Sequence, residues 1–478
     1  MKKYLGYWLV SALALTGGSC LSASTENPAN CTIPGNACGD EEVCDTMKQM
    51  CVPKKLSCTD SSACDFTVPA CPALTHVCTA CSADTECKSW SMTHNMFAGS
   101  AQAPKFNYCK TAACHECSPD AADTPEGSIH CPDALAKICD KTSLTCRGCV
   151  SDGDCKSGIC RKVGDFPENA PVSGLMTGQC VAVSDIAYAS NNASGCDNTM
   201  GTKTAPFCTV DKAIMSGKKY INLQGGNYPA LSVTGGNVVI AGPGRDASTP
   251  AVFPSISLTG AGTLTLSGLQ VSANLVAAAI SCRGGSTLYV RDVAILKATG
   301  GRGIDAEQDC AKVFVDRTRI NGTTNYGIIV GGAGSAATVQ YSITNTAVTS
   351  SGVNVGVEEH GVYFGSKSST TGLFAFNTVT NSCYRGVGCQ VSRSISDSIV
   401  QGNQVSQVDA CTQTRMVLSG AELEMGAEPK LKNPSTANDN CCVDKGLMPA
   451  GQIMVPTDFY GVSRPQGGGY DIGYHELK

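Results

Sequence analysis

Glu358, Glu359, His360 and Arg385 form the densest group of acid, base and cation in the second half of the sequence. Hydrolysis of a glycosidic bond would need two carboxylates facing one groove, roughly 5–9.5 Å apart. Elimination beside a uronate would need an acidic cluster for Ca2+ and an arginine or lysine to take the proton. Glu358 and Glu359 are the only adjacent acids after residue 180, so the sequence offers few groups for either reaction.

These residues stand at equivalent places of a repeat. Its core is a glycine followed by an aliphatic residue, and alternation along a strand turns the aliphatic side chain inward. The next position then faces outward, and the residue before each glycine lies at the turn into the strand. If the repeats stack on one another, polar and aromatic side chains at these positions form a column that suits a bound sugar chain. Such side chains are also ordinary on the exterior of a protein built from stacked repeats. The repeated pairs are Gly303-Ile304, Gly327-Ile328, Gly361-Val362 and Gly386-Val387. The outward column is Asp305, Ile329, Tyr363 and Gly388, and the turn column is Arg302, Tyr326, His360 and Arg385. The candidate ligand patch is Asp305, Tyr326, Glu358, Glu359, His360, Tyr363 and Arg385.

Short apolar strands recur before these glycines. Leu264, Leu288, Val313 and Val339 lead four of them at nearly even spacing, and Leu373 follows after a longer interval that indicates an insertion. Strands this short with only turns between them leave no room for helices. A repeat of this length built from strands stacks into a solenoid, because each turn buries its apolar face only against its neighbours.

The composition excludes several classes of protein. The chain has 478 residues, of which 42% are hydrophobic and only 16% charged, so it is too apolar for a disordered protein. The net charge of -5 provides no basic field for a polyanion, and we expect no nucleic-acid partner. Thirty cysteines indicate an oxidising compartment.

The start of the chain, residues 1–20, is typical of a secretory signal. Lys2 and Lys3 precede an apolar run of ~12 residues, which is too short to span a membrane. Cys20 stands where bacterial lipoproteins carry the acylated cysteine, although Gly17 replaces the usual leucine; the alternative is ordinary cleavage near Ala23. The sequence predicts export, either to the outer membrane or cell surface through a lipid anchor or into the medium. Any membrane contact would be through that anchor.

Cysteines divide the remaining chain. Residues 31–180 contain twenty, and the spacing C-x6-C-x2-C-x5-C starts at Cys71 and again at Cys139. Repeated spacing indicates repeated small modules whose crosslinks replace a core. Three C-x2-C pairs, which begin at Cys78, Cys114 and Cys146, could also bind zinc, but after a secretory signal the disulfide interpretation is favoured and no metal is expected.

Both ends of the second half carry further motifs. Residues 205–214 (APFCTVDKAI) resemble the "PF-x-T-I-x-x-A" helical cap of the pectate-lyase-like superfamily, and Gly225-Gly226-Asn227-Tyr228 resembles its first-turn "G-x-Y". The tail from Asp458 to Glu476 resembles the "D-x-x-G-x-x-R-P … DIGAYE" ending of bacterial surface members. The resemblance implies an all-β fold, a right-handed parallel β-helix, preceded by a small disulfide-rich, loop-dominated region. A helix near Thr209 to Ser216 would cover the first end of the β-helix and the tail the last.

The expected organisation is a signal peptide over residues 1–20, cysteine-rich modules over 21–182 and the β-helix over 183–478. The superfamily includes enzymes and inert surface proteins, so its fold does not assign a function. The scarcity of acids favours a non-catalytic surface or secreted protein that binds glycans or cell-envelope partners and needs no cofactor. The alternative is a lyase or hydrolase of an acidic polysaccharide, and Ca2+ would be needed only for the lyase.

Stacked strands also predict disulfides within the rod. Equivalent positions of adjacent strands lie ~4.8 Å apart, within reach of a disulfide. Cys282 and Cys310 are separated in sequence by the same interval as Cys383 and Cys411, about one turn of the repeat plus a short extension. We predict Cys282–Cys310 and Cys383–Cys411 between turns and Cys196–Cys208 before the first turn. The rival for the second pair is Cys383–Cys389; otherwise Cys389 is expected to pair with Cys441 or Cys442.

Overall fold

The structure is a computed structural model, and it divides the chain into two compact units. The first unit contains residues 1–121, 129–133 and 139–146, and the second contains 122–128, 134–138 and 147–478. The description here covers residues 178–418 apart from 192–194, 275–276, 300 and 353–358, shorter stretches between 42 and 161, and 423–424, 430–431 and 458. Across this described part, no helix is long and apolar enough to cross a bilayer.

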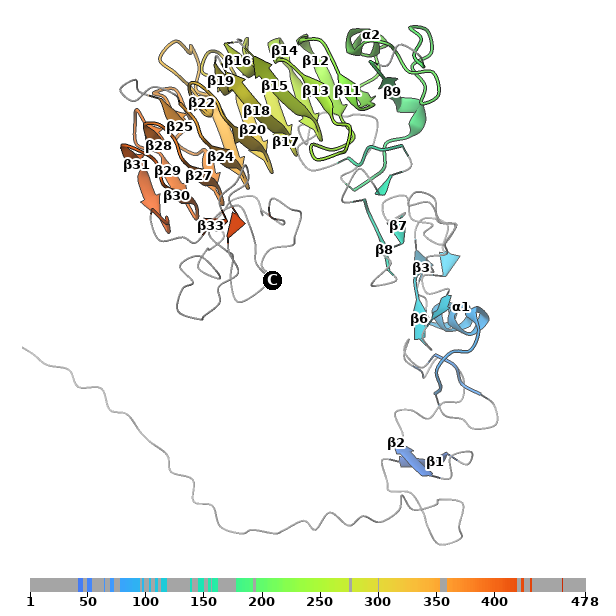
Figure 1. The fold of residues 1–478 in the computed structure, drawn as a ribbon. Helices are drawn as coiled ribbons and strands as arrows, with labels where there is room; N and C mark the ends of the chain where they lie inside the picture. The colour runs from blue at the N-terminus through green and yellow to red at the C-terminus, as the bar shows by residue number, and fades with distance from the viewer. Residues whose placement is uncertain are drawn as a thin grey trace, which may run out of the picture. The chain divides into compact units, whose positions relative to one another are not determined.

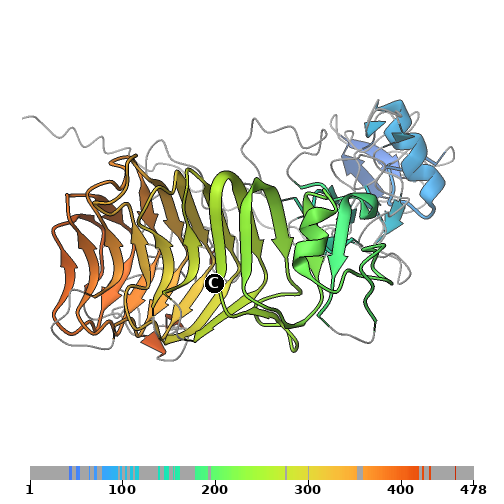
Figure 2. The ribbon, with the colours of Figure 1, turned by 90° about the horizontal axis from the view of Figure 1, so that it is seen from above.

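The second unit is a parallel β-solenoid, as the sequence predicts (Figure 1). Each full turn contributes one strand to each of three columns, and strands of one column pair in parallel with those of the next turn (Figure 2). The first column carries most of the candidate residues. It comprises the first half of β12 (Leu231–Ala241), the first half of β14 (Ile256–Ser267), β16 (Ala278–Cys282), β19 (Arg302–Ala306), β22 (Ile328–Val330), β25 (His360–Phe364), β28 (Arg385–Cys389) and β31 (Ser406–Asp409).

The other two columns complete each turn. The second comprises β9 (Ile186–Ala189), β10 (Tyr220–Leu223), the second halves of β12 and β14, β17 (Thr287–Arg291), β20 (Lys312–Asp316), β23 (Gln340–Thr344), β26 (Leu373–Ala375), β29 (Ser394–Ser396) and β32 (Thr412–Thr414). The third is an 8-stranded sheet of β11 (Gly226–Asn227), β13 (Ala251–Phe253), β15 (Gln270–Asn274), β18 (Ala294–Thr299), β21 (Arg319–Asn321), β24 (Ala347–Thr349), β27 (Thr378–Thr380) and β30 (Ile399–Gln401).

The predicted inward column of the first strands is confirmed. Ile304 pairs with Ile328, Ile328 with Val362, and Val362 with Val387, and all four side chains are fully buried. The glycine before each aliphatic residue is required by space. A Cβ on Gly327 would lie 2.5 Å from the carbonyl oxygen of Gly361, and other glycines of the column meet the next turn in the same way. The glycines therefore let the turns stack closely.

Two lead residues of the second column were assigned wrongly. Leu373 pairs with Ser342, one place after Tyr341, so it does not occupy the inward position. Val313 pairs with Tyr341 and not with the expected Val339, so this turn is longer than the sequence spacing indicated. Val339 is nevertheless buried, and it forms an isolated bridge with Ser368. Tyr341 takes the inward position and stacks on Phe364 at 4.6 Å, because an aromatic ring can fill the same core site as an aliphatic side chain.

The short helix predicted at the start of the solenoid is present as α2 (Val210–Met215). The Thr209 side chain caps it by accepting a hydrogen bond from the Lys212 amide at 3.2 Å. Val210 and Ala213 are buried in the same hydrophobic core as the first turns. The helix therefore covers part of the first turns. At the other end, most of the expected capping tail lies outside the described residues. In its described part, β33 (Leu423–Glu424) pairs with β34 (Lys430–Leu431). Asp458 is fully buried.

In the residues that the structure describes, the cysteine-rich half has one α-helix and short strand pairs. Its elements are β1 (Glu42–Asp45), β2 (Met50–Pro53), α1 (Asp84–Thr93), β3 (Phe97–Ala98), β4 (Ala103–Pro104), β5 (Tyr108–Lys110), β6 (Ala113–His115), β7 (Ile138–Cys139) and β8 (Cys146–Arg147), followed by the 3-10 helix η4 (Val183–Asp185). Trp90 of α1 is buried against Cys64 and Cys78, and its indole donates to the Cys64 carbonyl oxygen at 2.6 Å. Few side chains other than cysteines contribute to such a core.

Disulfides in this half follow one crossed pattern. In each of two groups of four successive cysteines, the first pairs with the third and the second with the fourth. Cys64–Cys78 and Cys117–Cys139 are further pairs. The crossed groups are Cys81–Cys109 with Cys87–Cys114, and Cys149–Cys160 with Cys155–Cys180. The spacing repeat noted in the sequence therefore corresponds to a repeated connectivity.

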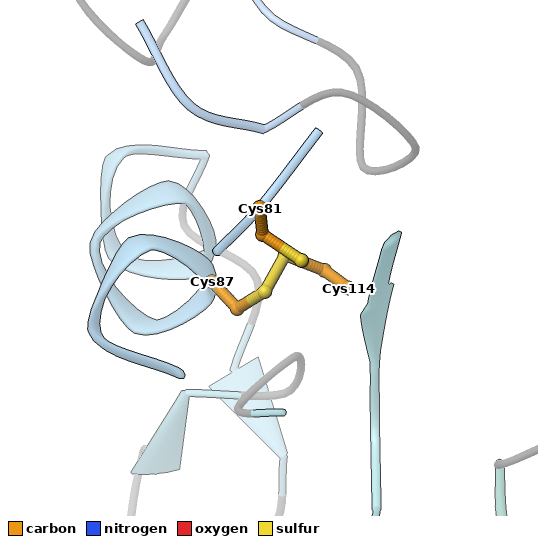
Figure 3. Close-up of side chains that lie close together, drawn as sticks. All are labelled: Cys81, Cys87 and Cys114. Carbon is orange, nitrogen blue, oxygen red and sulfur yellow. A yellow bond between two sulfur atoms is a disulfide. The ribbon is translucent and has the colours of Figure 1, made fainter. Parts of the chain in front are cut away.

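The sulfur atoms that could have formed metal sites are used in these bonds. Cys81, Cys87 and Cys114 lie close together, and Figure 3 shows the bond that joins Cys87 to Cys114. Cys81 is bonded to Cys109. Every cysteine of the three C-x2-C pairs is disulfide-bonded, so the disulfide interpretation is confirmed.

The last crossed group belongs to the solenoid unit. Ile159 and Val181 are buried against the outer face of the first turns, where they contact a cluster that includes Tyr188 and Tyr220. The Tyr188 hydroxyl donates to the Ser157 carbonyl oxygen at 3.2 Å. Ile159 and Val181 therefore belong to the continuous part of the second compact unit, which runs from Arg147 to Lys478.

Two predicted disulfides of the rod are present and one is wrong. Cys282–Cys310 joins adjacent turns with a Cα separation of 5.2 Å, and Cys196–Cys208 closes the loop before α2. Cys411, however, pairs with Cys389 and not with Cys383. Cys383 is partly exposed and is a free thiol in the described part of the chain.

The positions of the cysteines within their turns explain this error. Cys282 and Cys389 occupy the same inward position of the first column, where they pair with Leu258 and Phe364 of the preceding turn. The turn that follows Cys389, from Val387 to its partner Val408, is shorter than the turn from Ile280 to Ile304 that contains Cys282. Equal separations in sequence therefore do not define equal positions in the solenoid. The alternatives that paired Cys389 with Cys383, Cys441 or Cys442 are also excluded by the Cys389–Cys411 bond.

Candidate functional site

Six of the seven candidate residues lie on or beside the first column of strands. Asp305 is on β19, His360 and Tyr363 are on β25, and Arg385 begins β28. Tyr326 lies just before β22, and Glu359 lies just before β25. Glu358 falls outside the described residues. The stacking of turns thus brings together side chains from four different turns of the chain.

Aromatic rings make up the centre of this region. The Tyr326 and His360 rings stack with a centroid distance of 5.8 Å and an interplanar angle of 7°. Tyr363 lies 4.9 Å from His360 and 5.6 Å from Tyr326. Tyr384, which the sequence analysis missed, meets His360 edge-on at 5.7 Å. We call these four residues, Tyr326, His360, Tyr363 and Tyr384, the aromatic patch.

The accessibility of the patch differs from the expected pattern. His360 is 1% exposed and forms the interior of the patch, and the neighbouring Glu359 is 4% exposed. The three tyrosines remain partly exposed. His360 therefore supports the tyrosine rings from behind, and the surface available to a ligand is aromatic.

Asp305 is also buried, although it stands in the column expected to face solvent. Its carboxylate accepts hydrogen bonds from Arg283 at 2.7 Å and Arg302 at 3.0 Å, and from the Glu307 amide at 3.0 Å. Arg302 also pairs with Glu307. Burial opposes the charge on Arg302, yet these two carboxylates outweigh burial and raise the pKa of the guanidinium. Asp305 is therefore committed to a structural ion-pair network.

A second ion pair flanks the patch on its other side. Arg385 pairs with Asp409 of the next turn at 2.7 Å, and its guanidinium lies 4.6 Å from the centroid of the Tyr384 ring. Arg302 lies over Tyr326 in the same way at 5.7 Å. Each end of the patch thus carries an arginine that covers a tyrosine and is neutralised by a carboxylate.

Sequence reasoning missed three members of this arrangement. Tyr384 aligns with Glu359 in the repeat, one place before the column that was considered. Arg283 and Asp409 are counterions that lie in neighbouring turns, but neither is the strand partner of the residue it pairs with, because Asp305 is aligned with Ser281 and Arg385 with Ser406. Their pairing depends on side-chain direction, which a strand register does not define.

Among the residues that the structure describes here, the acids of the region do not belong to a group of three or more potential metal ligands. Groups of three or more potential metal ligands in the described part of the chain consist of cysteines, and their sulfurs are in disulfides. A Ca2+ site would need about six to eight oxygen ligands. Asp305, Glu307 and Asp409 are instead directed to arginines.

Comparison with known proteins adds little to this geometry. No protein-family description matches the sequence, and no curated protein matches it. Among solved structures, a mutant of the PL6 family alginate lyase AlyGC aligns with 15% identity and a TM-score of 0.28, over 61% of this chain and 42% of that chain. The chain therefore spans less than half of that enzyme. A likeness at this level does not bear on activity.

Proposed function

We propose that this protein is a non-catalytic surface or secreted protein that binds a carbohydrate chain at the aromatic patch. The observation that carries the proposal is that three successive turns each present a partly exposed tyrosine around one buried histidine. A tyrosine ring offers a flat apolar face and a hydroxyl that donates and accepts hydrogen bonds, which matches the apolar faces and hydroxyls of sugar rings. The stacked strands hold the rings at fixed separations, so little side-chain conformational entropy is lost on binding.

A binding measurement tests this role directly. Glycans that the full chain retains on an array would be titrated calorimetrically against the parent protein and Tyr363→Ala. We expect this substitution to weaken binding about tenfold or more, since a truncated aromatic contact costs over ~1 kcal/mol. Tyr289→Ala is the matched control, because Tyr289 is also partly exposed on the solenoid but lies on the second column, stacked on Phe314. Equal weakening by both substitutions would argue against the patch.

An enzymatic role is the competing outcome. The purified chain would be incubated with pectate and alginate, with and without Ca2+. We expect no new ultraviolet absorbance from unsaturated chain ends. If such absorbance appears with the parent protein and is lost with Arg302→Ala or Arg385→Ala, the protein is a lyase and the proposal fails.

We also propose that the protein is exported, through a lipid on Cys20 or by release after cleavage. Nine disulfides lie within the described residues, and such bonds persist in oxidising compartments. Fractionation of cells that produce the full chain or Cys20→Ala distinguishes the two routes. Loss of the protein from the membrane fraction on substitution indicates acylation, and no change indicates release or another anchor.

A further inference from the structure

The charged groups around the aromatic patch already satisfy one another. Arg302 is held between Asp305 and Glu307, and Arg385 is paired with Asp409. A guanidinium that binds one carboxylate in this way has fewer donors left for another anion. Both arginines beside the patch therefore have fewer N–H donors available for an acidic ligand.

The net charge of the neighbourhood points the same way. Three arginines, Arg283, Arg302 and Arg385, border the patch, whereas the carboxylates Asp305, Glu307, Glu359 and Asp409 outnumber them by one. The whole chain is also negative, at -5. An anionic polymer would thus meet a local field of its own sign and guanidinium groups that already bind carboxylates.

Asp305 is also unavailable to a divalent cation that could bridge protein and ligand. Ca2+ could bridge protein and ligand carboxylates only where several protein oxygens converge. Asp305 is 3% exposed and accepts three hydrogen bonds, so its oxygens are not accessible to such an ion.

We infer that the aromatic patch takes an uncharged polysaccharide and discriminates against uronate polymers. The inference rests on the proposed carbohydrate binding and adds the chemical class of the ligand. Recognition then depends on the tyrosine faces and on hydrogen bonds to sugar hydroxyls. The arginines border the patch at its two ends. Such binding should change little with salt, because screening weakens only interactions between charges.

The test compares charged with uncharged ligands. Fully methyl-esterified homogalacturonan oligosaccharides and the same oligosaccharides after de-esterification would be titrated into the full chain, beside uncharged glucan, mannan and galactan oligosaccharides. We expect at least one uncharged ligand to bind about tenfold or more tightly than the de-esterified one. Preferred or equal binding of the de-esterified ligand would overturn the inference and leave carbohydrate binding intact. Absence of binding to both charged and uncharged ligands would overturn the proposed function as well.

A substitution identifies the cause of the discrimination. Asp409→Asn releases Arg385 from its carboxylate without changing the size of the side chain. We expect this variant to gain affinity for the de-esterified oligosaccharide in a salt-dependent manner and to keep its affinity for the uncharged ligand. Unchanged rejection of the acidic ligand by Asp409→Asn would show that the Arg385–Asp409 pair does not set the specificity.

Discussion

Gly388 lies against the ring of His360, so that a Cβ at Gly388 would clash with the imidazole. Gly388 pairs with Tyr363 of the preceding turn, and in the sequence it interrupts a column of polar and aromatic side chains. In the structure, the missing side chain leaves the space that His360 fills. The histidine can then stack on Tyr326 and contact Tyr363 and Tyr384.

Gly388→Ala should therefore displace His360 and disturb the aromatic patch. We expect a loss of roughly 1–3 kcal/mol in unfolding free energy, typical of overpacking, together with weaker glycan binding and a changed near-ultraviolet circular dichroism spectrum. Gly195→Ala is the matched control, because nothing lies within 4 Å of the added Cβ there. A Gly388→Ala variant that matches the parent protein in stability and spectrum would show that His360 can move away freely.

The buried column of the first strands should dominate stability. Ile328→Ala removes a fully buried side chain between Ile304 and Val362 and should cost about 2–5 kcal/mol in unfolding free energy. Tyr363→Ala, one place beyond Val362 and partly exposed, should cost far less. Denaturant unfolding of both variants checks this, and equal shifts of the two midpoints would contradict the strand register.

The crossed connectivity predicts partners for two further cysteines. Cys71 and Cys146 are both disulfide-bonded. Because Cys64–Cys78 and Cys117–Cys139 each fit as one link of a crossed group, the pattern predicts Cys58 as the partner of Cys71 and Cys131 as the partner of Cys146. Proteolytic peptide mapping without reduction measures these pairs. A link from Cys71 or Cys146 to any other cysteine would limit the repeat to the two complete groups.

Alkaline pH should weaken the first turns of the solenoid through Tyr228. Its hydroxyl donates to the Gln224 carbonyl oxygen at 2.7 Å, and burial raises the pKa of Tyr228 to about 12 from an ordinary value of 10.0. The folded state thus favours the neutral phenol, so this contribution is complete below pH 10 and is lost as the pH rises towards 12.

Urea unfolding at a series of pH values would test this assignment. Tyr228→Phe should be less stable than the parent protein at neutral pH, because a hydrogen bond is lost, and its stability should fall less steeply between pH 10 and 12. If both proteins lose stability equally over this interval, another group is responsible.

The solenoid can be deduced from the amino-acid sequence, because each turn must bury aliphatic residues against the next. That requirement leaves a periodic trace in Ile304, Ile328 and Val362, and it fixes which side of each strand is inside. The same periodicity placed Tyr326, His360 and Tyr363 in neighbouring turns and correctly paired Cys282 with Cys310. Local rules also sufficed for Thr209 at the start of α2, since a helix cap involves only neighbouring residues.

Properties that depend on turn length and side-chain direction emerge only from the folded chain. Cys411 meets Cys389 and not Cys383 because Cys389 occupies the inward strand position that Cys282 has in its own turn, and that position is not visible until the strands are paired. Asp305 is buried in an ion-pair network, although its strand position faces outward, because arginines from two turns converge on it. The burial and the ion pairing of side chains at the patch depend on contacts between turns, and these contacts join residues that are distant in sequence.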